Sequence, residues 1–147
     1  GWHANMDWKE ALKLPASGEI QYVRELVESR PELERVPDQG LIAGENSDRA
    51  VERIAGMRGG DGSYAFIYLP AGKGKEAVNT GKLSGTELKS WWFDPRTGKA
   101  AAGETFAKGD SKEFIAPLGS EVSEEQRDWV LVLDDAAKNY SAPGTQN

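Results

Sequence analysis

The chain has 147 residues, with 38% hydrophobic and 29% charged side chains, which suits one globular domain with its own core and a short additional segment. Its net charge of −6 argues against a nucleic-acid partner, and no apolar run is long enough to cross a membrane, so we expect no membrane partner. The absence of cysteine excludes disulfides, thiol nucleophiles and cysteine-ligated zinc.

Residues 1–40 have the pattern of a helical segment. Ser17 precedes a stretch whose apolar residues recur at helical spacing, so that one face is apolar and the other charged: Ile20, Val23, Leu26 and Val27. Pro31 ends this helix, because the residue before a proline is pushed out of the α region. We expect residues 36–40 to form a loop.

Residues 41–135 have short apolar segments separated by glycine-rich turns, which is typical of β-structure. The pattern predicts clear strands at 64–69, 88–93, 112–115 and 128–133, and weaker strands at 50–57, 75–79 and 100–106. Short strands at this spacing indicate a sandwich or a barrel, and we predict an antiparallel β-sandwich of about seven to eight strands. The polar residues 136–147 are expected to form a flexible tail.

Three turns are predicted from their composition. The run Gly59-Gly60-Asp61-Gly62 is a hairpin signal in front of strand 64–69. In Asp94-Pro95-Arg96-Thr97-Gly98, the proline fixes the second turn position, the aspartate can accept backbone N–H bonds, and Gly98 can take a positive φ. This turn would join strands 88–93 and 100–106. Residues 69–72 also contain a proline followed by a glycine, and we expect them to form a similar turn that ends strand 64–69.

Strand 88–93 carries a large aromatic side chain on each face, because side chains alternate along a strand. Trp91 and Phe93 point to one side, and Leu88 and Trp92 to the other. One face must line the core. The other could be covered by the N-terminal helix through Ile20, Val23 and Val27, by a neighbouring domain, or by a sugar ring.

The sugar hypothesis needs an exposed platform, for which Trp92 and Tyr68 are the candidates. Arg96 extends from the turn and would either brace a neighbouring carboxylate or reach the ligand. Trp129 alternates with Leu131, and we expect it in the core. If Trp91, Trp92 and Trp129 are all buried, the binding hypothesis loses its platform.

Catalytic chemistry is difficult to build from these residues. His3 is the single histidine, and no nucleophile-elbow motif accompanies it. Asp134 and Asp135 are adjacent at a strand end, so they point to opposite faces and do not form the facing pair that glycoside hydrolysis requires. We expect both to be solvated. Neither they nor Asp61 match a calcium loop. We predict no catalytic residue, no metal site and no cofactor.

Four motifs, in their order and spacing, resemble one known family. They are Tyr64 with the run Phe66 to Gly72, the run WWFDPRTG from Trp91 to Gly98, Phe114 with Pro117, and DWVLVLDD from Asp128 to Asp135. They are similar to the module named "putative collagen-binding domain of a collagenase", the C-terminal β-sandwich of apiosidase-like (β/α)8-barrel glycoside hydrolases. Residues 8–39 resemble the segment that closes the barrel in those enzymes.

The resemblance implies a non-catalytic accessory module that packs on, or supports, a catalytic (β/α)8 barrel. Such a barrel needs roughly 250 residues, so its catalytic carboxylates would lie outside this chain. The alternative is an independent module that binds polysaccharide or collagen through exposed aromatic side chains. The resemblance also implies a secreted or periplasmic protein, although no signal peptide is visible in this chain.

Overall fold

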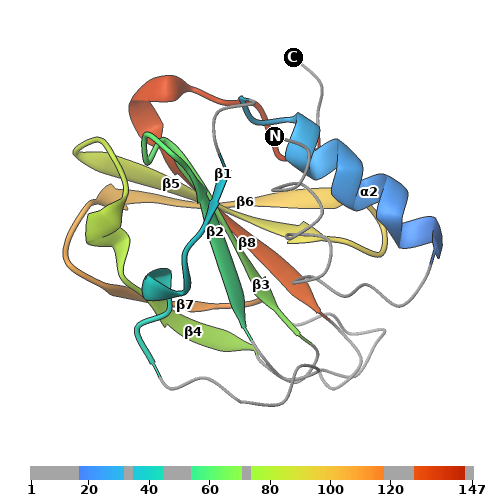
Figure 1. The fold of residues 1–147 in the computed structure, drawn as a ribbon, viewed down its shortest axis with the longest axis horizontal. Helices are drawn as coiled ribbons and strands as arrows, with labels where there is room; N and C mark the ends of the chain where they lie inside the picture. The colour runs from blue at the N-terminus through green and yellow to red at the C-terminus, as the bar shows by residue number, and fades with distance from the viewer. Residues whose placement is uncertain (1–16, 32–34, 45–53, 71–73, 118–127, 145–147) are drawn as a thin grey trace.

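The computed structural model describes residues 17–31, 35–44, 54–70, 74–117 and 128–144 (Figure 1). They form one helix, α2 (Ser17–Glu28), and eight strands. The strands are β1 (Arg35–Pro37), β2 (Ala55–Gly59), β3 (Tyr64–Leu69), β4 (Lys75–Val78), β5 (Glu87–Asp94), β6 (Lys99–Ala107), β7 (Lys112–Ile115) and β8 (Trp129–Asp135). Short 3-10 turns are η1 (Gln39–Leu41), η3 (Thr80–Lys82) and η5 (Ala136–Lys138). The described helix does not have the length and apolarity needed to cross a membrane.

The strands form two antiparallel sheets, which confirms the predicted mainly β fold. The larger sheet has the order β1-β2-β3-β8-β5-β6, and the smaller one pairs β4 with β7. The last strand along the chain, β8, lies inside the larger sheet and pairs with β3 on one side and β5 on the other.

Apolar side chains cover both faces of the larger sheet. One cluster lies between the two sheets and includes Val78 and Phe114 from the smaller sheet. The other lies beneath α2, from which Val23, Leu26 and Val27 enter the core. Figure 1 shows α2 and the smaller sheet on opposite sides of the larger sheet. The sandwich therefore carries a third, helical layer.

The side chains of β5 alternate between these two clusters, as the strand period requires. Trp91 and Phe93 lie beneath α2, whereas Leu88 and Trp92 lie between the sheets. Among the predicted coverings of the second aromatic face, the N-terminal helix is the one that the structure contains. The side chain of Ile20 lies outside the described residues.

The two turns that flank the core strands form as predicted. Gly98 N–H donates to Asp94 O over 2.8 Å, and Gly98 has a φ of 74°. Gly62, with a φ of 77°, closes the hairpin between β2 and β3. The third predicted turn, at residues 69–72, lies partly outside the described residues.

Two segments differ from their predictions. Residues 36–40 were expected to form a loop, but Arg35–Pro37 pairs with β2 at the edge of the larger sheet. A strand this short is too brief to display alternation. Tyr140 and Ala142 pack against the cluster beneath α2, whereas the polar composition of residues 136–147 predicts a flexible tail. Residues 145–147 lie outside the described part of the chain.

Candidate functional site

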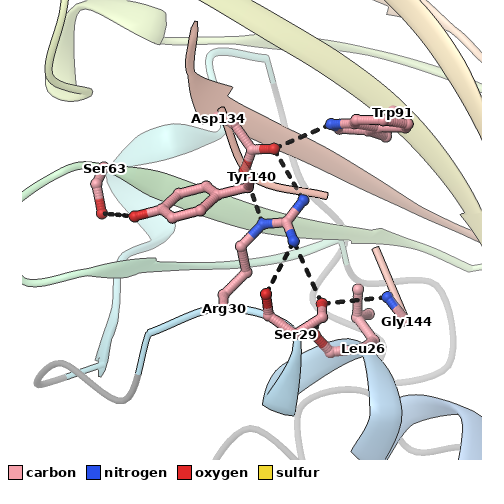
Figure 2. A network of polar contacts seen from close by, with 8 residues as sticks. All are labelled: Leu26, Ser29, Arg30, Ser63, Trp91, Asp134, Tyr140 and Gly144. Carbon is pink, nitrogen blue, oxygen red and sulfur yellow. Dashed lines mark hydrogen bonds and ion pairs between the residues drawn. The ribbon is translucent and has the colours of Figure 1, made fainter. Parts of the chain in front are cut away.

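A buried ion pair joins the end of α2 to the end of β8 (Figure 2). Arg30 Nε donates to Asp134 Oδ1 over 2.9 Å, and Arg30 Nη2 donates to Oδ2 over 2.8 Å. The indole N–H of Trp91 in β5 donates to the same Oδ2 over 2.9 Å. The side chains of Arg30 and Asp134 are only 0% and 3% exposed. One carboxylate thus links the helix to two strands of the larger sheet.

The end of the helix positions Arg30. α2 ends at Glu28, two residues before Arg30, and Pro31 prevents the helix from continuing. The Arg30 guanidinium turns back and donates from Nη1 to Ser29 O. Arg35 Nη2 donates to Val27 O and Arg30 O, which are carbonyls at the helix end. Two guanidinium groups therefore supply the hydrogen bonds and positive charge that a helix C-terminus favours.

The residues after β8 complete this cluster. The Arg30 guanidinium carbon lies 5.0 Å from the centroid of the Tyr140 ring, which places the cation over the ring face. The Tyr140 hydroxyl bonds to Ser63 Oγ, and Gly144 N–H donates to Ser29 Oγ. Figure 2 shows these contacts meeting around Arg30. They tie the C-terminal residues to the helix.

Burial dominates the titration of Asp134. Its removal from water raises the pKa of the carboxyl above its ordinary value, against the opposing effect of the Arg30 and Trp91 donors. Both carboxylate oxygens already accept hydrogen bonds from these side chains. The arrangement suits a fixed structural contact between elements.

Asp134 and Asp135 are not solvated, which corrects the prediction made from their place at a strand end. Asp134 is 2% exposed and Asp135 is 7% exposed. Asp135 accepts from the Ser84 hydroxyl over 2.8 Å and from Ala137 N–H over 3.0 Å. Both carboxylates are used to fix the end of β8.

An open pocket lies beside this cluster. Its volume is about 220 Å3, and it is lined by Lys89, Asp134, Asp135, Ala136, Asn139 and Tyr140. The Lys89 ammonium lies 4.2 Å from the centroid of the Trp91 ring. Within the described ranges, no three acidic or histidine side chains are grouped so as to hold a metal ion.

The predicted binding residues do not form one site. Trp92 is 8% exposed and packs edge-to-face on Trp129, with ring centroids 6.1 Å apart. Tyr68 belongs to the cluster on the other side of the sheet. Trp91 and Trp129 are also buried. The expected platform of Trp92 with Tyr68 is therefore replaced by two separate core positions.

Tyr68 and Arg96 do meet, at a second buried carboxylate. The Tyr68 hydroxyl donates to Asp128 Oδ2 over 2.9 Å, and Arg96 Nε lies 3.5 Å from Asp128 Oδ1. Arg96 Nε also lies 3.4 Å from Asp94 Oδ1. Burial raises the pKa of Asp128, while the Tyr68 hydrogen bond opposes this rise. Of the two roles considered for Arg96, bracing carboxylates is the one observed.

Sequence reasoning did not find the Arg30–Asp134 pair. The sequence offered two signals. One was a charged residue directly before a proline, and the other was an aspartate at the end of an apolar strand. Neither indicates a partner 104 residues away along the chain.

Residues 36–134 match the model of the family described as "Putative collagen-binding domain of a collagenase". The chain belongs to this family. The match spans β2 to β8 and most of β1, so it covers the sandwich and leaves out α2. No curated protein matched the chain.

Solved structures similar to the chain are longer proteins. One, described as a glycoside hydrolase, has 30% sequence identity and a TM-score of 0.74, with 91% of this chain and 28% of that chain covered. Another is a glycoside hydrolase family 5 protein from Bacteroides vulgatus, with 30% identity and a TM-score of 0.74. There, 91% of this chain and 27% of that chain are covered. The chain thus spans just over a quarter of the length of these proteins and resembles one part of each.

Proposed function

We propose that this chain is a non-catalytic accessory module of a glycoside-hydrolase-type protein, in which it packs on and supports a catalytic (β/α)8 barrel. The observation that carries the proposal is the extent of the structural matches. Nearly all of this chain matches just over a quarter of each longer glycoside hydrolase. The rest of such a chain has ample length for a barrel of roughly 250 residues.

The docking of α2 supports this role. Since Val23, Leu26 and Val27 enter the core and Arg30 pairs with Asp134, helix and sandwich form one packed body. A domain that packs against α2 would therefore rest on a rigid part of the module. A module with this architecture fits the task of fixing the position of a neighbour.

The second candidate is independent binding of polysaccharide or collagen through Trp92, Tyr68 and Arg96. Burial of Trp92 and Tyr68 counts against it, because stacking on a ligand requires an accessible ring face. The engagement of Arg96 with Asp94 and Asp128 counts against it as well. The accessory role is the better supported of the two.

The natural polypeptide that carries this sequence provides the test. We expect it to contain a barrel domain, and we expect removal of residues 17–147 to lower the Tm of that barrel while its catalytic residues stay intact. The isolated chain should hydrolyse none of a panel of aryl glycosides and plant polysaccharides. A natural polypeptide without a barrel, hydrolysis by the isolated chain, or a barrel with unchanged Tm and kcat/KM after removal would each contradict the proposal.

The proposal also places the protein outside the cytoplasm, in the periplasm or the medium, where polysaccharide substrates are found. Fractionation of the source cells, followed by immunodetection of this chain, tests the location. Recovery with the cytoplasmic fraction alone would contradict it.

A further inference from the structure

The pocket beside the Arg30–Asp134 pair contains polar groups that the packing of the fold does not use. It opens between β5, the end of β8 and η5, and has a volume of about 220 Å3. Its lining combines an ammonium, two carboxylates, an amide and a phenol ring, from Lys89, Asp134, Asp135, Asn139 and Tyr140.

Lys89 and Asn139 supply the unengaged hydrogen-bonding groups. Within the described part of the chain, the Lys89 ammonium contacts the Trp91 ring but has no hydrogen-bond acceptor. The Asn139 amide donates one long bond, 3.4 Å, to Ala137 O. Among the described residues, no donor reaches the side-chain carbonyl oxygen of Asn139. Asn139 is held in the left-handed conformation, with φ 52° and ψ 44°, at the end of η5.

The charges around the pocket compensate one another. Asp134 is paired with Arg30 and is also attracted by the Lys89 ammonium, so the pocket presents the Lys89 cation between two carboxylates, Asp134 and Asp135. Asp135 is fixed by hydrogen bonds from Ser84 and Ala137. An anion or a cation entering here would meet a like charge together with an opposite one. A neutral ligand with several donors and acceptors fits this lining better.

We infer that this pocket binds a single neutral sugar ring. Pockets for drug-sized ligands have volumes of about 300 to 1,000 Å3, so a volume below that range suits one ring and not an oligosaccharide. Hydroxyl groups can accept from Lys89, exchange hydrogen bonds with Asn139 and donate to Asp135. Arg30 covers one face of the half-buried Tyr140 ring, and the part of the ring that lines the pocket offers an apolar surface to the C–H groups of the sugar. The site is separate from the buried aromatic platform considered above, and it does not depend on the accessory role.

NMR titration of the whole chain tests the inference. Backbone amide shifts are followed while neutral methyl glycosides of common hexoses and pentoses are added up to about 50 mM, because the binding energy available from so few ligand atoms gives a Kd of about 1 mM. Parallel titrations use methyl glucuronide as an acidic sugar and short oligosaccharides as chain ends. Binding of the methyl glycosides supports the inference, whereas binding confined to oligosaccharides would contradict it, because the pocket volume suits one ring.

Two variants locate the binding. Asn139→Gly keeps the left-handed backbone and removes the amide, and Lys89→Met keeps the stem over Trp91 and removes the ammonium. We expect each to weaken binding about tenfold, in line with the loss of one hydrogen bond to a charged or polar group. Lys138→Ala, an exposed neighbour in η5 that does not line the pocket, should bind like the parent chain.

Shifts that map to residues 89, 135, 139 and 140, and that need about tenfold more sugar in each variant, support the inference. No shift with any neutral methyl glycoside, binding by both variants as tight as that of the parent chain, or binding of the glucuronide alone would overturn it.

Discussion

Arg30 and Asp134 are buried ions, and each offsets the free-energy cost of removing the other's charge from water. Replacing Arg30 by Met leaves the Asp134 carboxylate buried without its cation, which we expect to lower the free energy of unfolding by about 3–5 kcal/mol. The double variant Arg30→Met, Asp134→Asn removes the charge and keeps an acceptor for the Trp91 indole. We expect it to be more stable than the single variant. Urea denaturation of the four proteins in this cycle gives the coupling energy.

Arg58→Met is the matched control for that cycle. Arg58 pairs with Asp38 over 2.9 Å, but its side chain is 24% exposed. We expect a cost of at most about 1 kcal/mol, since partly solvated pairs contribute little. A double variant no more stable than Arg30→Met alone would show that the pair does not hold the helix as described.

We expect Asp128 to make the stability of the protein depend on pH. Because burial raises its folded-state pKa above the unfolded value, the folded state retains a proton that the unfolded state releases. The contribution of Asp128 to stability is therefore greatest below the unfolded pKa of about 3.9 and falls as the pH rises through the folded pKa. Asp128→Asn should remove this fall while keeping an acceptor for Tyr68.

Urea denaturation of the parent chain and Asp128→Asn from pH 3 to pH 7 checks this expectation. The parent should lose stability relative to the variant as the pH rises. A difference in unfolding free energy that does not change with pH, or that changes in the opposite direction, would contradict the proposed cause.

At the scale of elements, the helix is held mainly by its apolar face. Leu26 is fully buried between α2 and the larger sheet. We expect Leu26→Ala to lower the free energy of unfolding by about 2–5 kcal/mol, because it leaves a cavity in addition to losing buried surface. Glu28→Ala, on the exposed side of the same helix, should change it by less than about 0.5 kcal/mol. Equal effects of the two changes would mean that α2 is not docked on the sheet.

The elements were largely predictable from the sequence, and their reasons are local. Tyr64–Leu69 and Lys112–Ile115 form strands at the predicted residues, because β-rich composition and flanking turn residues act within a few positions. Gly98 adopts the positive φ that its turn requires. The edge strand Arg35–Pro37 was missed, since three residues contain too little pattern.

The candidate site was far less predictable, because its contacts join distant parts of the chain. Alternation correctly separated Trp91 from Trp92, but it could not say that the Trp91 indole would bond to Asp134. It likewise gave no means of seeing that Tyr140 would pack on Arg30. The sequence of a helix or strand predicts which of its side chains share a face. Which residues that face contacts depends on the tertiary packing of segments that are distant in the sequence.

At the scale of the whole molecule, the sandwich depends on the segment before it. The cluster beneath α2 includes Phe66, Trp91 and Phe93, which the helix covers. We expect a chain that starts at residue 41 to expose this apolar face, to bind the dye ANS and to lose near-UV circular dichroism. A chain that starts at Ser17 should keep the spectrum and Tm of the full sequence. A native spectrum from residues 41–147 would instead support an independent sandwich with a boundary at residue 40.

The position of β8 has a consequence for how the protein is made. Its partners β3 and β5 leave the ribosome well before it, yet they are separated in the sheet until β8 arrives between them. Contacts this distant in sequence slow folding, since closing the long loop between them costs conformational entropy before the contacts form. The larger sheet therefore closes only when translation of the segment is nearly finished. Any domain encoded ahead of it would have folded by then, and could serve as a surface on which the late strands assemble.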